Sequence, residues 1–312
     1  MRRFPEPRDY AVHKKTADEA QIVHKTETAP VFRADLRNGA KAVYPFGPGN
    51  RRTGNKMMSK PDTRTVTAAA LAIGDELLSG RTKDKNIGHL AELLTAAGID
   101  LEEVRIVPDD HERIVEALNA LRRRYDHVFT SGGIGPTHDD ITADAVAAAF
   151  GVACDYDPDA LALLGAHYAE RGLEFTDARR RMARMPLGSR HIDNPVSLAP
   201  GFTTGNVHVM AGVPSVFQAM LDNVLPTLET GTKVLSDKVS CPFGEGDIGD
   251  PLSVIAIAHP DVNIGSYPRF SGTKFSTEIV IRGRDPLAIN AAKLDVEAML
   301  TSVATKLDAA AQ

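Results

Sequence analysis

From Val66 onward, short apolar runs alternate with longer amphipathic segments, and this alternation limits the fold more than any other feature. The first run, Val66 to Ile73, precedes a predicted helix over Asn86 to Ala97. Apolar residues recur there at helical spacing, and Gly98 follows as a C-terminal stop. Strands that alternate with helices are typical of βαβ units. The sequence therefore predicts an α/β class, with three αβα layers around a mainly parallel sheet.

The same alternation continues toward the middle of the chain. We expect the next strand over Glu103 to Val107, and a helix capped by Asp109 or Asp110. A strand over His127 to Thr130 should follow it. The later predictions are helices near Pro158 to Arg171 and Thr176 to Met185, a loop-rich strand region over Pro186 to Gly212, and a helix from Pro214 to about Leu225.

Three segments are predicted along the chain. Residues 1–60 mix proline, glycine and basic residues without periodicity and are expected to be a disordered basic extension; an arm for an acidic partner and a start assigned too far upstream both stay open. Residues 61–230 form the α/β domain. Residues 231–312 predict a small α+β domain of order βαββα, with strands at 234–240, 262–268 and 275–282 and helices at 245–258 and 286–302.

Charge and composition exclude several classes of protein. Residues 1–60 carry 13 basic against 6 acidic residues, whereas the rest carry 23 against 35. A body with net charge −12 argues against general nucleic-acid binding, and the βαββα segment lacks the G-x-x-G clamp of a KH module. The apolar runs are too short to span a membrane. Cys154 and Cys241 form no C-x-x-C pair, so we expect a reducing, cytoplasmic setting.

A glycine-rich stretch, Thr130 to Thr142, carries the strongest functional signal. Gly132, Gly133 and Gly135 follow a predicted strand and lead into a helix. Glycines allow positive φ angles and close backbone approach, and a helix start offers free N–H groups to an anion. The pattern predicts a phosphate-binding loop. A second strand-to-helix turn, containing Gly212 and Pro214, predicts another anion site.

Asp139 and Asp140 change the interpretation of that loop. A phosphate charge about 4 Å from a carboxylate is repelled by roughly 4 kcal/mol at an effective dielectric of about 20. A helix start returns only about 0.3 to 1 kcal/mol at an exposed site. A divalent cation between the two resolves the conflict, and Mg²⁺ commonly binds one or two carboxylates together with substrate phosphates. We therefore expect metal-assisted chemistry on a diphosphate, with Mg²⁺ or Co²⁺ at Asp140 and Asp139.

Residues 66–228 resemble the molybdopterin-binding, or molybdenum cofactor biosynthesis, domain family. The segments that match are Gly74 to Arg81 with Asp84 and Asn86, Gly132 to Thr142, Met185 to Ser189, and Ala211 to Pro214. Within the family, the chain is most similar to the N-terminal region of competence/damage-inducible protein A and to the corresponding domain of FAD synthase. The resemblance implies an oligomeric protein that binds molybdopterin or an adenine dinucleotide near the glycine loop.

The resemblance also implies roles for individual residues. In adenylyltransferase members, acids at the positions of Asp140 and Asp109 are needed for activity, and the doublet Asp139-Asp140 places this chain with the pyrophosphatase branch. We expect a hydrolase that cleaves the diphosphate of ADP-ribose or FAD through a cation-activated water. The predicted substrate-binding residues are Gly132, Gly133, Gly135, Thr137, Asp75, Glu76, Gly212 and Pro214.

Simpler interpretations stay open for several of these residues. Asp109 with Glu112, and Thr137 with Asp140, each fit a capping box, which needs no ligand. The arginines at 179, 180, 181 and 184 are interpreted as a solvated helix face rather than a phosphate clamp. Two other functions also fit the sequence: a non-catalytic molybdopterin-binding module, and an adenylyltransferase that transfers AMP from ATP to molybdopterin.

Overall fold

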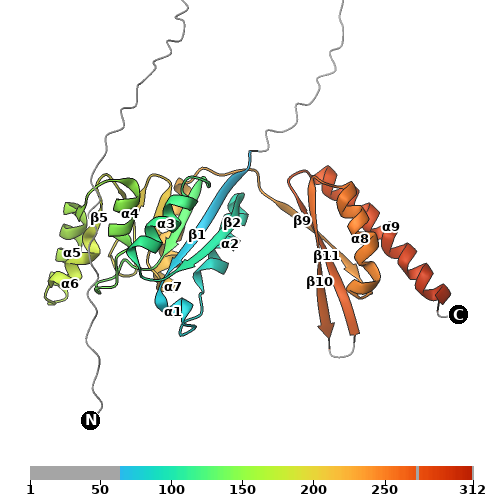
Figure 1. The fold of residues 1–312 in the computed structure, drawn as a ribbon, viewed down its shortest axis with the longest axis horizontal. Coiled ribbons are helices and arrows are strands. Elements are labelled where there is room, and N and C mark those ends of the chain that lie inside the picture. The colour runs from blue at the N-terminus through green and yellow to red at the C-terminus, as the bar shows by residue number, and fades with distance from the viewer. Residues whose placement is uncertain (1–63, 272–273, 311–312) are drawn as a thin grey trace, which may run out of the picture. The chain divides into compact units, whose positions relative to one another are not determined.

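A computed structural model describes residues 64–271 and 274–310 of the 312-residue chain, so the extension predicted over 1–60 lies outside the described residues. The α/β part is built on a six-stranded sheet of order β2-β1-β3-β8-β7-β6 (Figure 1). Its strands are β1 (Val66–Ile73), β2 (Ile99–Val107), β3 (His127–Ser131), β6 (Arg190–Ile192), β7 (Gly201–Thr204) and β8 (Val207–Met210). The first four strands in this order are parallel; at one edge β7 pairs antiparallel with β8, and β6 pairs antiparallel with β7.

Helices cover both faces of this sheet, which confirms the three-layer prediction. One layer contains α3 (His111–Leu121), α4 (Thr142–Phe150) and α5 (Pro158–Glu170), and the other contains α2 (Asn86–Ala97) and α7 (Pro214–Val224). Strand β1 shows how the sequence produces this arrangement. Its Leu71 packs with the first layer and its Ala70 with the second, because successive side chains of a strand point to opposite faces. A strand buried on both faces is nearly continuously apolar, as β1 is apart from Thr67.

Short elements complete the α/β part. These are α1 (Asp75–Leu78), β4 (Cys154–Tyr156), α6 (Asp177–Arg180), the 3₁₀ turn η1 (Arg181–Ala183), β5 (Arg184–Pro186) and the 3₁₀ turn η2 (Leu225–Thr227). The helix predicted over Thr176 to Met185 is wrong in its second half. Pro186 disfavours helical geometry at the preceding residue, and β5 pairs instead with β4 in a two-stranded sheet. The helix therefore ends at Arg180.

The C-terminal part has the predicted order βαββα. Its elements are β9 (Leu235–Cys241), α8 (Glu245–Ala258), β10 (Val262–Ser271), β11 (Lys274–Gly283) and α9 (Pro286–Ala310). The strands form an antiparallel sheet of order β10-β11-β9. Side chains of both helices pack on one face of it, where Val239 and Ile281 meet Leu252 and Val296. Within the described residues, no helix is both long and apolar enough to cross a membrane.

Candidate functional site

The carboxyl ends of the parallel strands border a cleft of about 560 Å³. Because β1 connects to β2 on one side and β3 lies on its other side, the strand order reverses beside β1. Ligands of open α/β sheets commonly bind at such a point. Nine of the predicted site residues line this cleft, namely Glu76, Asp109, Gly132, Gly133, Gly135, Asp139, Asp140, Gly212 and Pro214.

The two remaining predicted residues lie one contact away from the cleft lining. The backbone N–H of Asp75 donates to Oδ2 of Asp109 at 3.0 Å. The backbone N–H and the hydroxyl of Thr137 both donate to Oδ2 of Asp140, at 2.8 and 2.5 Å. Asp75 and Thr137 therefore hold lining carboxylates in place, and the structure brings the whole predicted set together.

The glycine loop is held in a shape that only glycine tolerates at two positions. Gly132 has φ 108° and Gly133 has φ 70°. A Cβ on Gly132 would lie 2.3 Å from the carbonyl oxygen of Ile73, and one on Gly133 would lie 2.1 Å from Oγ1 of Thr142. Thr142 closes the loop, since its N–H donates to the Gly133 carbonyl and its hydroxyl to the Gly132 carbonyl, both at 3.0 Å.

The helix that follows the loop lacks a side-chain cap. Among the residues that the structure describes, no side chain accepts a hydrogen bond from the first turn of α4, and the same is true of α7, which begins at Pro214. Asp110 and Asp157, by contrast, cap α3 and α5. Thr142 of α4 donates its N–H to the Gly133 carbonyl, and Val216 and Phe217 of α7 donate theirs to the Val213 carbonyl. The N–H groups that stay available in the described part of the chain are those of Ala143, Asp144 and Ser215. The two uncapped helices begin beside the cleft, which suits an anionic ligand.

Carboxylates dominate one side of the cleft. Burial raises the pKa of Asp109; its hydrogen bond from Asp75 opposes this shift, and the nearby Glu76, Asp75 and Asp139 add to it. None of the described residues that line the cleft is lysine or arginine. Among the described residues, no group of three or more His, Cys, Asp and Glu is arranged to hold a metal ion. A cation here would need further oxygen ligands, such as phosphate oxygens and water.

The capping interpretation of Asp140 is correct in part. Its Oδ2 accepts from Thr137, as a turn-stabilising carboxylate would. Its Oδ1 has no hydrogen-bond partner in the described part of the chain. Asp109 does not cap α3, because the neighbouring Asp110 accepts from the N–H of Arg113 instead. Asp140 thus keeps Oδ1 outside its turn, and Asp109 accepts from Asp75 rather than capping α3.

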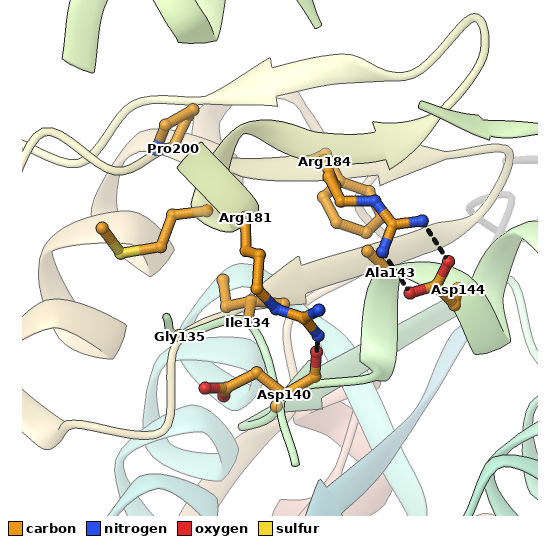
Figure 2. Close-up of a pocket in the computed structure, with 11 residues that line it drawn as sticks. Ile134, Gly135, Asp140, Ala143, Asp144, Arg181, Arg184 and Pro200 are labelled. Carbon is orange, nitrogen blue, oxygen red and sulfur yellow. Dashed lines mark hydrogen bonds and ion pairs between the residues drawn. The ribbon is translucent and has the colours of Figure 1, made fainter. Parts of the chain in front are cut away.

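Sequence reasoning named two polar residues at this end of the sheet but assigned neither to the site. Asn86 is buried, and its Nδ2 donates to Oγ of Ser131 and to the Gly212 carbonyl, both at 2.8 Å. It joins the ends of both glycine turns, although nothing in its local spacing indicates this role. Arg181 lines a small recess that shares Gly133, Gly135 and Asp140 with the cleft (Figure 2). The sequence interpretation treats the arginines at 179, 180, 181 and 184 alike, as a solvated helix face, and so does not indicate that Arg181 lies beside the loop.

Comparisons with known families agree with this architecture. The family described as the probable molybdopterin binding domain matches residues 69–230, just over half of the chain. The family described as the middle domain of FAD synthase matches residues 233–308. The two matches correspond to the α/β part and the βαββα part.

Individual relatives cover different shares of this chain. A protein of Aeropyrum pernix is 40% identical over 212 residues, 64% of this chain and 78% of its own length. A CinA-like protein of Citrifermentans bemidjiense is 43% identical over 169 residues, 52% of this chain but only 41% of that protein. The solved structure of CinA from Thermoplasma acidophilum is 33% identical and covers 52% of this chain and 98% of that chain, with a TM-score of 0.49.

Proposed function

Since this chain belongs to the family of the probable molybdopterin binding domain, we propose that it is a divalent-cation-dependent hydrolase of the diphosphate bond in an adenine nucleotide of the ADP-ribose or FAD type. One observation carries the proposal. Four carboxylates, from Glu76, Asp109, Asp139 and Asp140, line a cleft beside a glycine loop, and no basic residue in the described lining neutralises them. Such a cleft repels a diphosphate unless a cation is present.

The residues present fit a hard divalent cation. Carboxylate oxygens are the ligands that Mg²⁺ prefers, and one or two of them suffice when phosphates and waters complete the coordination. Asp140 and Asp139 would hold Mg²⁺ or Co²⁺, with phosphate oxygens and waters as the remaining ligands. When bound, the cation would offset the repulsion between carboxylates and phosphates and polarise the phosphorus that is attacked.

The chain's own groups would bind and orient the nucleotide. Backbone N–H groups of the glycine loop and of the α4 and α7 starts would donate to phosphate oxygens. Pro214 and Val216 give the cleft apolar surface that would suit a planar ring. Thr137 would keep Asp140 fixed through its two hydrogen bonds. A cytoplasmic location and a homo-oligomeric state stay part of this proposal.

The test is hydrolysis by the purified full chain. ADP-ribose, FAD, ATP and NAD are each incubated with and without Mg²⁺ or Co²⁺, and released AMP is measured by chromatography. We expect AMP from ADP-ribose or FAD only when the cation is present. Asp140→Asn and Asp109→Asn should each lower the rate by about 100-fold or more, because each removes a charge near the reacting phosphates. Both variants should fold, since an amide oxygen can still accept the hydrogen bonds from Thr137 or Asp75.

Asp110→Asn is the matched control. Asp110 is adjacent to Asp109 but caps α3, and asparagine caps as well as aspartate does. This variant should hydrolyse at the wild-type rate. Unchanged hydrolysis in Asp140→Asn and Asp109→Asn would refute the proposal. Tight pterin binding without AMP release would favour a binding module, and AMP transfer from ATP to molybdopterin would favour an adenylyltransferase.

A further inference from the structure

Four arginines lie between residues 179 and 184, and the structure separates one of them from the others. Arg184 makes two hydrogen bonds to the carboxylate of Asp144, at 2.6 and 2.9 Å. Arg180 lies 3.8 Å from Asp177. Arg179 donates to the Glu174 carbonyl and lies over the ring of Tyr168. These three arginines have local partners that account for them.

Among the described residues, Arg181 has a single, long hydrogen bond and no carboxylate or aromatic partner. Its Nη2 donates to the backbone carbonyl of Asp140 at 3.3 Å, near the upper limit for a hydrogen bond (Figure 2). Its Nε is buried and makes no hydrogen bond. No carboxylate lies within 4 Å of its guanidinium among the described residues. A partly buried cation that lacks both a counter-ion and a partner for one donor is costly, unless an anion completes it.

The position of Arg181 indicates where that anion would lie. The recess around it is lined by Gly133, Gly135, Asp140 and Met182, all of which also line the cleft. The guanidinium therefore approaches the glycine loop from the side of η1, whereas Glu76 and Asp109 approach the cleft from the ends of β1 and β2. It is the basic side chain that the described lining of the cleft itself lacks.

We propose that Arg181 contacts the ligand directly and donates hydrogen bonds from its guanidinium to a phosphate oxygen held at the glycine loop. The inference rests on the proposed function for its ligand class. A planar guanidinium with free donors matches the oxygens of a phosphate, and hydrogen bonds between charged groups are the stronger kind. Arg181 would supply positive charge at the glycine loop from the side of η1, beside Asp140. It would recognise the phosphates and make no contribution to binding the base.

The test compares Arg181→Ala with Arg180→Ala in the full chain. Pyrophosphate and ADP-ribose binding are measured by calorimetry with and without Mg²⁺, and adenosine binding by ligand-observed NMR. Loss of a charged hydrogen bond predicts an affinity for pyrophosphate and ADP-ribose that is lower by about 10- to 100-fold in Arg181→Ala. Adenosine binding should not change. Arg180→Ala should bind all three like the wild type, because Arg180 has its partner on its own helix. Arg181→Lys should recover part of the affinity, since it keeps the charge without the planar fork.

The outcomes distinguish this inference from the proposed function. Pyrophosphate affinity that depends on Arg181, in a protein that hydrolyses no nucleotide, would uphold the inference and refute the hydrolase. Equal pyrophosphate affinity in the wild type and Arg181→Ala would overturn the inference and leave the hydrolase untouched. An equal loss of adenosine and pyrophosphate binding would also overturn it, because Arg181 would then act only by holding the Asp140 segment. A wild type that binds no phosphate ligand at all would refute both.

Discussion

Strands β3 and β8 are hydrogen-bonded neighbours. The polar groups near their amino ends are paired with one another, whereas those beyond their carboxyl ends are left available. Toward the amino ends, His127 and His208 form a buried chain. The Glu229 carbonyl can only accept, so Nε2 of His127 donates to it at 3.1 Å, and Nδ1 of His127 is left to accept from Nε2 of His208 at 3.3 Å. Nδ1 of His208 then accepts from the hydroxyl of Thr203 at 3.1 Å. Every ring nitrogen has a partner.

The carboxyl ends of the same strands contrast with this closed chain. Both lead into glycine turns, and a Cβ on Gly212 would lie 3.3 Å from the Cα of Gly132. The helices that follow have uncapped first turns, and carboxylates without basic partners line the space beside them. Satisfied polar groups stabilise the amino ends, whereas unsatisfied ones at the carboxyl ends are available to a ligand. The contrast teaches that unpaired donors and acceptors, more than the number of polar residues, distinguish a binding site from a buried polar cluster.

Substitution at the glycine turns should give the largest effect. In Gly132→Ala, the new Cβ would lie 2.3 Å from the Ile73 carbonyl at φ 108°, so we expect a loss of about 3 kcal/mol or more in the free energy of unfolding. Gly212→Ala should lose about 1 kcal/mol, because its contact of 3.3 Å needs only a small shift. Urea unfolding of both variants measures the difference. Equal losses would show that the two turns are not held as differently as the geometry indicates.

Acid should destabilise the protein through His208, near the amino ends of β3 and β8. Burial, with His127 and Arg190 nearby, lowers the pKa of His208 to about 3. The unfolded histidine takes up a proton near pH 6.5 and the folded one only near pH 3. The contribution of His208 to the free energy of unfolding is therefore fully present above pH 6.5 and decreases as the pH falls toward 3. The slope is about 1.4 kcal/mol per pH unit. We therefore expect a loss of about 2 to 3 kcal/mol between pH 6.5 and pH 4.5, measured by urea unfolding across this range.

Two variants test the assignment of this slope to His208. His208→Gln removes the titrating group and should flatten the pH dependence, although the variant is less stable at pH 7. His111→Gln replaces an exposed histidine at the start of α3 and should keep the wild-type slope. A slope that persists in His208→Gln would assign the acid sensitivity to other groups.

The sequence predicted the carboxyl ends of β3 and β8, where the cleft lies, better than the amino ends, where the two histidines lie. Glycines, acids and a proline at turns have local signatures, and they led to nine of the residues that line the cleft. The β1 and α2 boundaries were also predictable, because periodicity and Gly98 mark them. The histidine chain was not predictable, since His127 and His208 are 81 residues apart and meet only through strand pairing. Asn86 and Arg181 were not assigned to the site for the same reason, because their partners are distant in sequence.

Asn86 tests whether the two glycine turns form one unit. Asn86→Ala removes two buried hydrogen bonds and leaves the Gly212 carbonyl without its donor, so we expect a loss of about 2 kcal/mol in unfolding free energy. Ligand affinity should fall as well, because the spacing of the turns is no longer fixed. The control is Asn223→Ala. The Asn223 side chain on α7 is exposed and donates to the carbonyls of Asp193 and Ala219. A stable Asn86→Ala variant with full affinity would contradict the coupling of the turns.

The smallest effect is expected from adding a side-chain cap to α7, which follows the carboxyl end of β8. Val213 is 59% exposed, precedes α7 with extended geometry, and provides no side-chain cap. Val213→Ser should accept a hydrogen bond from the first turn and raise stability by about 0.5 to 1 kcal/mol. The same bond would occupy an N–H donor that we assign to phosphate, so pyrophosphate affinity measured by calorimetry should fall a few-fold. The control is Val254→Ser on the exposed surface of α8, which should leave this affinity unchanged. Higher stability with undiminished affinity would mean that the α7 start is open for a reason other than ligand binding.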